Sequence, residues 1–220
     1  MGLKVILSLK GGNVKKYNLG DFVFGAILFA IIVLMAFVPS LGFIPIIPGV
    51  AYATLLHIPV LIGAIFLGWK WGLALGLTFG ISSMTQAFLI MGPANAPFTN
   101  PIVSVLPRVL IGVLAPFMHS WLTKAFKGRD KLALFFTFGI MTIIHTVTVL
   151  TILYPIIETG WYYTKTTEDV ASITLKAILV SIVSINSLAE IVLAVLIGPA
   201  IYLPLDQLRK KKNNKLEEEV

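Results

Sequence analysis

The chain has 220 residues, of which 57% are hydrophobic and only 12% are charged, and its net charge is +7. Soluble domains carry about 25% charged residues, so this composition argues against a cytosolic enzyme and against a disordered protein. There is no cysteine, which excludes a small secreted domain built on disulfides. The basic residues lie in short groups between long apolar runs rather than on one face, which argues against nucleic-acid binding. The composition predicts a polytopic membrane protein.

Six apolar segments are long enough to cross a bilayer, which takes about 20 residues of helix. They lie at residues 20–38, 50–69, 71–91, 101–123, 132–155 and 177–203. A backbone in lipid must form its own hydrogen bonds, and the alternating pattern of a barrel strand is absent, so each segment is expected to be a helix. No cleaved signal is expected at the N-terminus, because only residues 5–7 are apolar before Lys10. The predicted fold is an all-α integral membrane protein with six transmembrane helices.

The distribution of Lys and Arg predicts the orientation of this bundle. All but three of the 17 basic residues lie on the side that carries both termini, and the exceptions are Arg108, Lys165 and Lys176. The positive-inside rule therefore places the N- and C-termini in the cytoplasm. Residues 1–205 are expected to form a single membrane domain, and residues 206–220 a cytoplasmic charged tail. The basic run at residues 209–212 is interpreted as an anchor near anionic lipid, and the acidic end after it as disordered.

The connections on the outer side are long and rich in proline and aromatic residues. They cover residues 39–48, 91–100 and 154–169. Apolar loop residues need cover, and proline restricts the loop backbone. These loops are interpreted as a lid over an outward-facing cavity. The alternative is that they cap the bundle at the membrane interface, where Trp and Tyr are enriched.

Arg108 is the most unusual residue within the apolar segments, because charged groups in a span are rare and usually face its interior. Asn100 and Pro101 have the pattern of a helix N-cap followed by a first-turn proline. Pro107 has no N–H and leaves the carbonyl of Val103 free. A capped, kinked helix start with an arginine suits a carboxylate, which a guanidinium can bind by two parallel hydrogen bonds. The alternatives are an ion pair with Glu190 or contact with lipid phosphate.

Further polar residues in the spans come from five segments, and all except Glu190 are expected in the outer half of the membrane. They are His57, Gln86, Thr142, His145, Tyr154, Asn186 and Glu190. Their gathering predicts a polar site, although any one of them alone is more often an interhelical hydrogen bond. For His145 the alternative is a neutral side chain that is already hydrogen-bonded. Glu190 is interpreted first as structural.

Small residues repeat every four positions through the second and third spans, at Ala64, Gly68, Gly72, Gly76 and Gly80. Such a stripe lets a neighbouring helix approach closely, and packing within the bundle is the expected use. The first span has a shorter pattern of the same kind, Ala26 and Ala30. For that span a partner outside the chain remains open.

Motifs of nucleotide binding and catalysis are absent. The sequence has no P-loop, no HExxH, no GxSxG and no cysteine, so no enzyme activity is expected. No two carboxylates come close together in any span, so no metal site is expected either. A proton-coupled carrier that uses Glu190 and His145 remains an alternative. It is disfavoured because residues 20–110 and 111–205 show no repeat, whereas secondary carriers usually have two related halves.

Three segments resemble the substrate-binding S components of energy-coupling factor (ECF) vitamin transporters. They are HIPVLIGAI at residues 57–65, LALGLTFG at 73–80 and NPIVSVLPR at 100–108. The resemblance covers most of residues 18–205 and is strongest to the pantothenate-specific group. It implies a multi-pass protein of a prokaryotic cell membrane that captures a vitamin from outside. It also implies partners, namely a transmembrane T component and two cytoplasmic ATPases, which use ATP while this chain holds no cofactor.

The resemblance implies a set of contacts for pantothenate. Arg108 would bind the carboxylate, and the groups for its hydroxyls and amide would be Asn100, Gln86, His57 and Asn186. The apolar part would be covered by Phe98, Tyr154 and Trp161. Ala26 and Ala30 match a motif by which family members contact the T component. Other vitamins remain alternatives, since folate is also an anion, and pyridoxine, riboflavin or cobalamin would not need an arginine.

Overall fold

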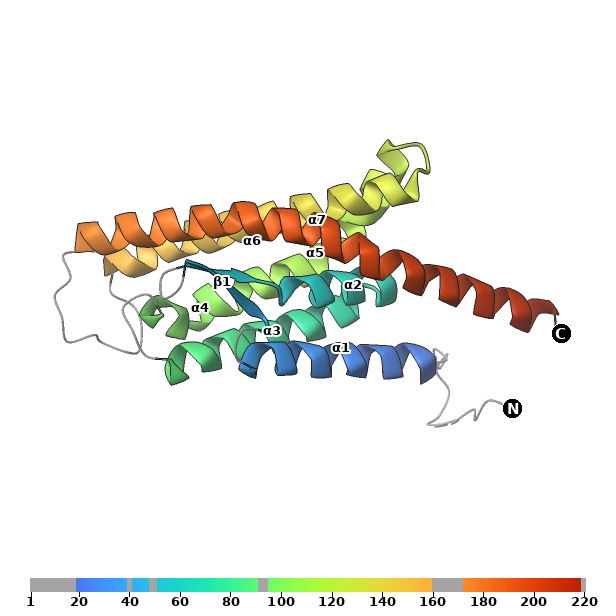
Figure 1. Ribbon diagram of the computed structural model, residues 1–220, viewed down its shortest axis with the longest axis horizontal. Helices are drawn as coiled ribbons and strands as arrows, with labels where there is room; N and C mark the ends of the chain where they lie inside the picture. Colours follow the sequence, from blue (N-terminus) through green and yellow to red (C-terminus); the bar gives the residue numbers. More distant parts are fainter. Residues whose placement is uncertain (1–18, 39–40, 48–50, 91–94, 160–171, 219–220) are drawn as a thin grey trace, which may run out of the picture.

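A computed structural model of the chain describes residues 19–38, 41–47, 51–90, 95–159 and 172–218. The long helices lie side by side in one elongated bundle (Figure 1). Its helices are α1 (Leu19–Phe37), α2 (His57–Leu67), α3 (Trp69–Leu89), α4 (Pro101–Ser104), α5 (Leu106–Ala125), α6 (Asp130–Thr159) and α7 (Ser172–Glu218). A 3-10 turn, η1 (Ala96–Thr99), precedes α4, and two strands, β1 (Phe43–Ile47) and β2 (Ala51–Thr54), precede α2.

Within the described residues, five helical stretches are long and apolar enough to cross a membrane. They are Leu19–Phe37, Trp69–Leu89, Pro101–Ala125, Asp130–Thr159 and Asn186–Lys211. These confirm five of the six predicted spans. The remaining one, α2, has 11 residues and is about 16 Å long, roughly half the thickness of the hydrocarbon core.

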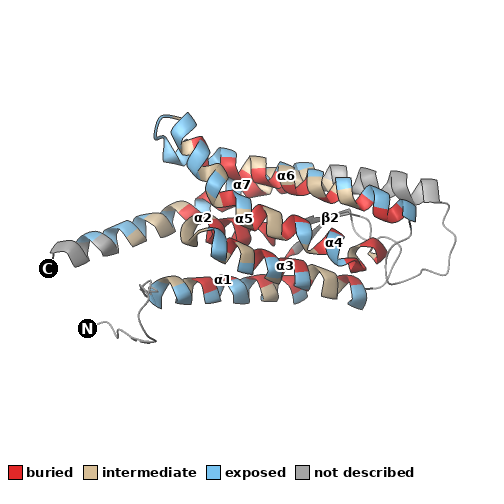
Figure 2. Ribbon diagram, turned by 180° about the vertical axis from the view of Figure 1, so that it is seen from behind, coloured by how far each residue is buried: buried red, intermediate tan, exposed pale blue. Residues whose placement is uncertain are grey.

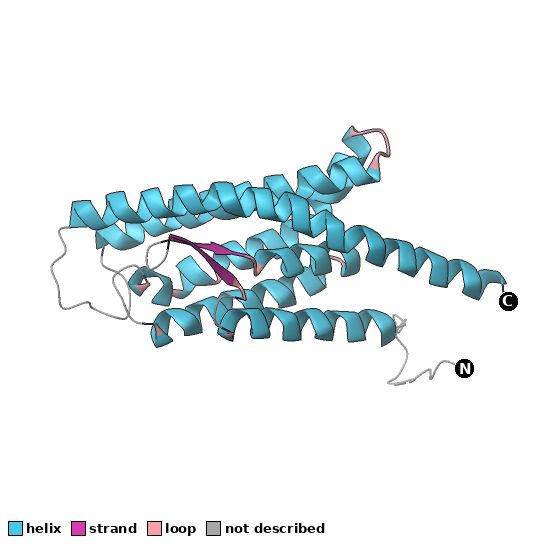
Figure 3. Cartoon of the chain, in the orientation of Figure 1, coloured by secondary structure: helices cyan, strands magenta, loops and turns pink. Residues whose placement is uncertain are grey.

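The second span was predicted as a full-length helix over residues 50–69, and that prediction is wrong for its first half. In a helix running back to residue 50, Pro59 would lie in the interior, where it lacks an N–H and clashes with the carbonyl of Leu55. In the structure Pro59 lies in the first turn of α2, where a proline is tolerated. The chain before it forms the antiparallel β1–β2 hairpin, with Phe43 opposite Thr54. This hairpin is the one departure from an all-helical fold in the described residues (Figure 3).

The described parts of the outer connections are more regular than loops. The hairpin occupies part of residues 39–48, and η1 occupies part of 91–100. Residues 154–159 belong to α6, so the expectation of a loop there is wrong. Residues 160–169 lie outside the described residues, and the lid stays a prediction.

The first residue of α1 and the last of α7 lie at the same end of the bundle (Figure 1), as an even number of crossings requires. The acidic end was expected to be disordered, but α7 continues as a helix to Glu218. Polar contacts hold the helix just before this acidic end. Lys210 pairs with Asp206 one turn earlier at 2.6 Å, and Arg209 donates to the carbonyl of Phe66 at 2.9 Å.

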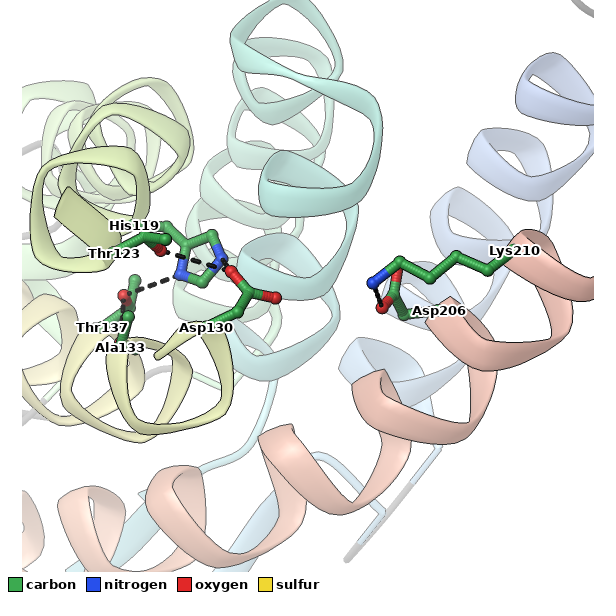
Figure 4. A network of polar contacts seen from close by, with 7 residues as sticks. All are labelled: His119, Thr123, Asp130, Ala133, Thr137, Asp206 and Lys210. Atoms are coloured by element: carbon green, nitrogen blue, oxygen red, sulfur yellow. Dashed lines mark hydrogen bonds and ion pairs between the residues drawn. The ribbon is translucent and has the colours of Figure 1, made fainter. Parts of the chain in front are cut away.

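A polar network holds the turn between α5 and α6 at this same end (Figure 4). His119 contacts Asp130 through Nε2 at 3.2 Å and Thr137 through Nδ1 at 3.3 Å. The Thr123 hydroxyl also donates to Asp130. Gly128 has a φ of +81° in the turn, a conformation that favours glycine. The network keeps the two helices antiparallel without a long loop.

Helix α1 lies at the edge of the bundle and buries a single stripe against its neighbours. The buried residues are Gly25, Leu28, Ile32 and Ala36, and most of the rest of the helix is exposed (Figure 2). Ala26 and Ala30 both belong to the exposed part. In a membrane this surface faces lipid or another protein.

The glycines of α3 pack directly against the backbone of α5, which confirms the predicted internal use of the stripe. A Cβ on Gly72 would meet the carbonyl oxygen of Gly112, and one on Gly112 would meet the carbonyl oxygen of Gly72. One turn along, a Cβ on Gly76 would lie 2.6 Å from the carbonyl oxygen of Arg108. The backbones of α3 and α5 therefore touch along this seam.

We expect Gly72→Ala to destabilise the protein by about 1–3 kcal/mol, because the added methyl group overlaps backbone atoms that cannot rotate away. The measurement is the unfolding transition of the detergent-solubilised protein. Gly139→Ala is the matched control, since its Cβ meets only the side chain of Val195, at 3.3 Å. Equal transitions for the two variants would contradict the proposed tightness of the seam.

Candidate ligand-binding site

Arg108 is the third residue of α5 and is 6% exposed. Its Nη1 donates a hydrogen bond of 2.6 Å to the carbonyl of Val103. Pro107 has no N–H for that carbonyl, as the sequence predicted, and the guanidinium takes the vacant position. The break between α4 and α5 thus holds the arginine in place.

No carboxylate pairs with Arg108 among the residues that the structure describes, and its Nε has no hydrogen-bond partner there. The rings of Phe79 and Phe98 lie 5.3 and 5.8 Å from the guanidinium carbon. The nearest described contacts of this buried cation are a carbonyl and two aromatic rings, and the charge of Glu190 acts on it from beyond ion-pair distance, so its charge is incompletely compensated. It provides a favourable position for an anion.

Glu190 was the alternative partner for this arginine, and it is engaged elsewhere. Its Oε1 accepts a hydrogen bond of 2.7 Å from the backbone N–H of Thr54 in β2. The carboxyl group therefore ties the hairpin to α7. This contact agrees with the structural interpretation of Glu190.

Two histidines lie face to face beside this arginine and phenylalanine. His57 begins α2 and is 0% exposed, and His145 lies midway along α6 and is 5% exposed. Their ring centroids are 6.2 Å apart with an interplanar angle of 16°, and Phe79 lies 6.1 Å from His145. None of the four ring nitrogens has a hydrogen-bond partner of good geometry within the described part of the chain, although the backbone of Thr54 lies close to His57. The interpretation of His145 as already hydrogen-bonded is wrong.

Asn100 caps α4, as predicted. Its side-chain oxygen accepts from the N–H of Ile102 at 2.8 Å. The hydroxyl of Ser104 also donates to the carbonyl of Phe98, so the cap, η1 and α4 form one compact turn. That turn places Phe98 beside Arg108. A ligand contact by Asn100 stays a prediction.

The other predicted site residues differ in burial and in their hydrogen-bond partners. Gln86 donates its amide to the carbonyl of Ala36 at 2.5 Å and so joins α3 to α1. Asn186 is half-buried in α7, and its side-chain oxygen has no partner among the described residues. Tyr154 is 51% exposed. Trp161 lies outside the described residues.

Four of the predicted residues, Arg108, His57, Phe98 and Asn186, bring unsatisfied polar atoms or an aromatic ring to the interior. The expected pantothenate contacts left out Phe79 and His145, although His145 was among the polar residues expected to gather. Phe79 carried no signal, because a phenylalanine in an apolar helix is ordinary. His145 carried one, since an ionisable side chain in the middle of a span is rare. Buried polar groups are nearly always hydrogen-bonded, so this cluster is suited to a polar ligand.

We expect Asn100→Ala to destabilise the protein by about 1 kcal/mol through loss of the cap. Asn100→Asp keeps the capping oxygen and should unfold close to the wild type. Unfolding transitions of the two variants check this. A transition as low for the aspartate as for the alanine would mean that the amide, and not the cap, stabilises this turn.

Comparison with known proteins places the chain in a family. Residues 21–202 match the family model described as "ECF transporter, substrate-specific component". The chain is 31% identical over 218 residues to "Pantothenic acid transporter PanT" of Lactococcus lactis, which covers 91% of this chain and 99% of that protein. It is 32% identical over 180 residues to "Pantothenate transporter PanT" of Leuconostoc mesenteroides, which covers 78% of this chain and 85% of that one.

These relatives are bacterial transporters, and five helices of the chain are long and apolar enough to span a membrane. The protein is a multi-pass protein of the plasma membrane. By a match over most of its length, it belongs to the family of substrate-specific components of ECF transporters.

Proposed function

We propose that this protein is the S component that captures pantothenate from outside the cell. The observation that carries the proposal is the buried guanidinium of Arg108, which has no carboxylate partner among the described residues. Pantothenate carries one carboxylate, which a guanidinium binds through two charge-assisted hydrogen bonds. The names of the two relatives support this choice of vitamin over other anionic ones.

The rest of the cluster suits the remainder of pantothenate. The vitamin has an amide in its middle, and its two hydroxyls and gem-dimethyl group lie in the part away from the carboxylate. Unpaired nitrogens on two histidines and an unpaired oxygen on Asn186 supply hydrogen bonds, and Phe79 and Phe98 supply apolar contact. A few placed polar groups among apolar side chains are typical of a small-molecule site.

The end of the bundle with the termini is proposed to face the cytoplasm. Positive charge gathers there, on the α2–α3 turn with Lys70, on the α5–α6 turn with Lys127 and Arg129, and on the C-terminal part of α7. Arg108 lies near the beginning of α5, and the other end of α5 leads into the α5–α6 turn. The site is thereby assigned to the outer half of the membrane, where it can receive a vitamin from outside.

Delivery is proposed to require partners, because the chain has no nucleotide-binding motif. A transmembrane T component would dock on the exposed surface of α1, where Ala26 and Ala30 allow close approach of another helix. Two cytoplasmic ATPases would hydrolyse ATP. This chain needs no cofactor of its own in that scheme.

We expect Arg108→Gln to weaken pantothenate binding on the order of 100-fold, because a buried charge-assisted contact is lost. The measurement is calorimetric titration of the purified protein, with riboflavin, folate, biotin and pyridoxine as competitors. Arg129→Gln is the control, since Arg129 is exposed at the far turn. Unchanged affinity in Arg108→Gln would exclude the carboxylate role, and displacement by another vitamin would replace the substrate.

We expect Ala26→Trp and Ala30→Trp to abolish uptake while leaving pantothenate affinity unchanged, because a bulky side chain separates α1 from its partner. Uptake is measured in cells that carry the T component and ATPases, with an ATPase-inactive strain as reference. Val23→Trp, at another exposed position of α1, shows whether any large residue has the same effect. Normal uptake in both alanine variants would exclude this surface as the docking site.

A further inference from the structure

Arg108 accounts for one end of the proposed ligand and leaves the imidazoles of His57 and His145 unused. These rings come from α2 and α6, which are far apart in the sequence, and they stack at 6.2 Å. His145 forms no ion pair or hydrogen bond with another described residue, and the one described group close enough to pair with His57 is the backbone of Thr54. A packing role alone would not explain them, because a phenylalanine would fill the same space without unsatisfied nitrogens.

One aromatic side chain lies near both the guanidinium and the imidazoles. Phe79 lies 5.3 Å from the guanidinium carbon of Arg108 and 6.1 Å from the ring of His145. His145 in turn stacks on His57. The cluster therefore contains a cation, an apolar ring and a pair of imidazoles.

The guanidinium and the pair of imidazoles differ in the groups they can bind. A guanidinium only donates hydrogen bonds and suits a carboxylate, which only accepts. A neutral imidazole has one donor nitrogen and one acceptor nitrogen, and a hydroxyl likewise donates and accepts. Two imidazoles side by side are therefore complementary to two hydroxyls and need no charge on the ligand. Pantothenate has its carboxylate at one end and its two hydroxyls at the other.

We propose that His57 and His145 together bind the hydroxyl-bearing end of the ligand while Arg108 binds its carboxylate, which makes His145 a specificity-determining residue. This rests on the proposed function, because the hydroxyls belong to pantothenate. A metal ion is the other common ligand of paired histidines. The described residues contain no group of three or more His, Cys, Asp or Glu side chains that could hold one.

The test compares pantothenate with N-(3,3-dimethylbutanoyl)-β-alanine, which keeps the carboxylate and amide but has hydrogen in place of both hydroxyls. The variant is His145→Phe, which keeps an aromatic ring beside Phe79, larger by one ring atom, and removes the nitrogens. The wild type should bind the analogue about 100-fold more weakly than pantothenate, because two hydrogen-bonding groups of the site stay unpaired. His145→Phe should lose about 10- to 100-fold in affinity for pantothenate and little for the analogue. Arg108→Gln should weaken both ligands alike.

A second measurement separates binding from structure. Without ligand, His145→Phe should unfold no earlier than the wild type, because it removes buried polar atoms that have no partner. Thr148→Val is the matched control, being half-buried one turn away in α6 with its hydroxyl already bonded to the carbonyl of Ile144. It should leave the preference for pantothenate unchanged.

Three results would overturn the inference. Wild-type affinity for pantothenate in His145→Phe would show that His145 does not bind the ligand. Equal losses for both ligands, with a lower unfolding transition, would show that it is structural. If the wild type binds no pantothenate at all, the proposed function fails and the assignment of the hydroxyls fails with it. If the wild type binds pantothenate tightly and His145→Phe binds it equally well, only the inference about the histidines fails.

Discussion

The backbone contact between α3 and α5 is the constraint on which the site depends. Gly72 and Gly112 leave no room for a Cβ between the two helices, and Gly76 lies against the carbonyl of Arg108. Because the backbones touch, the first turns of α5 are held at a set distance from α3. Phe79 on α3 is thereby brought beside the guanidinium on α5. Bulkier residues along this seam would displace the arginine together with its helix.

The unsatisfied polar atoms of the interior have a functional meaning only as a group. A buried water molecule could hydrogen-bond to a single nitrogen that has no partner in the protein. Here a guanidinium nitrogen of Arg108 and both ring nitrogens of His145, which lie near the same phenylalanine, lack partners among the described residues. Leaving such groups unpaired destabilises the protein, and a ligand that pairs with them regains that free energy on binding. This is the expected condition of a high-affinity site in a family that captures substrates before delivering them.

The two ends of the bundle are built differently. The end with the termini is tied by direct polar contacts, those of His119 with Asp130 and of Arg209 with Asp21 and Phe66. Toward the other end the backbone is interrupted, by the hairpin before α2 and by the break between α4 and α5. Irregular backbone within a membrane protein is tolerated where protein or a polar cavity covers it. The interruptions therefore coincide with residues that we propose to bind the ligand.

The sequence by itself determined the class of protein, five of the spans, the cap at Asn100 and the close packing of α3. It also determined that Pro107 leaves the carbonyl of Val103 without a backbone donor. Each of these follows from local chemistry, such as helix length in lipid, a missing N–H or a missing Cβ. The short α2 is also local in origin, since Pro59 limits the helix, but the hairpin that replaces its first half is stabilised by pairing with β1 and by Glu190 of α7.

Only the tertiary structure decided which polar side chains meet. Nearly every position of a membrane helix is apolar, so the sequence does not show which of its faces points inward. The stacking of His57 on His145, the place of Phe79 near both His145 and Arg108, and the use of Gln86 to join α3 to α1 all depend on that rotation. Contacts between helices set the rotation, and residues distant in the chain make those contacts.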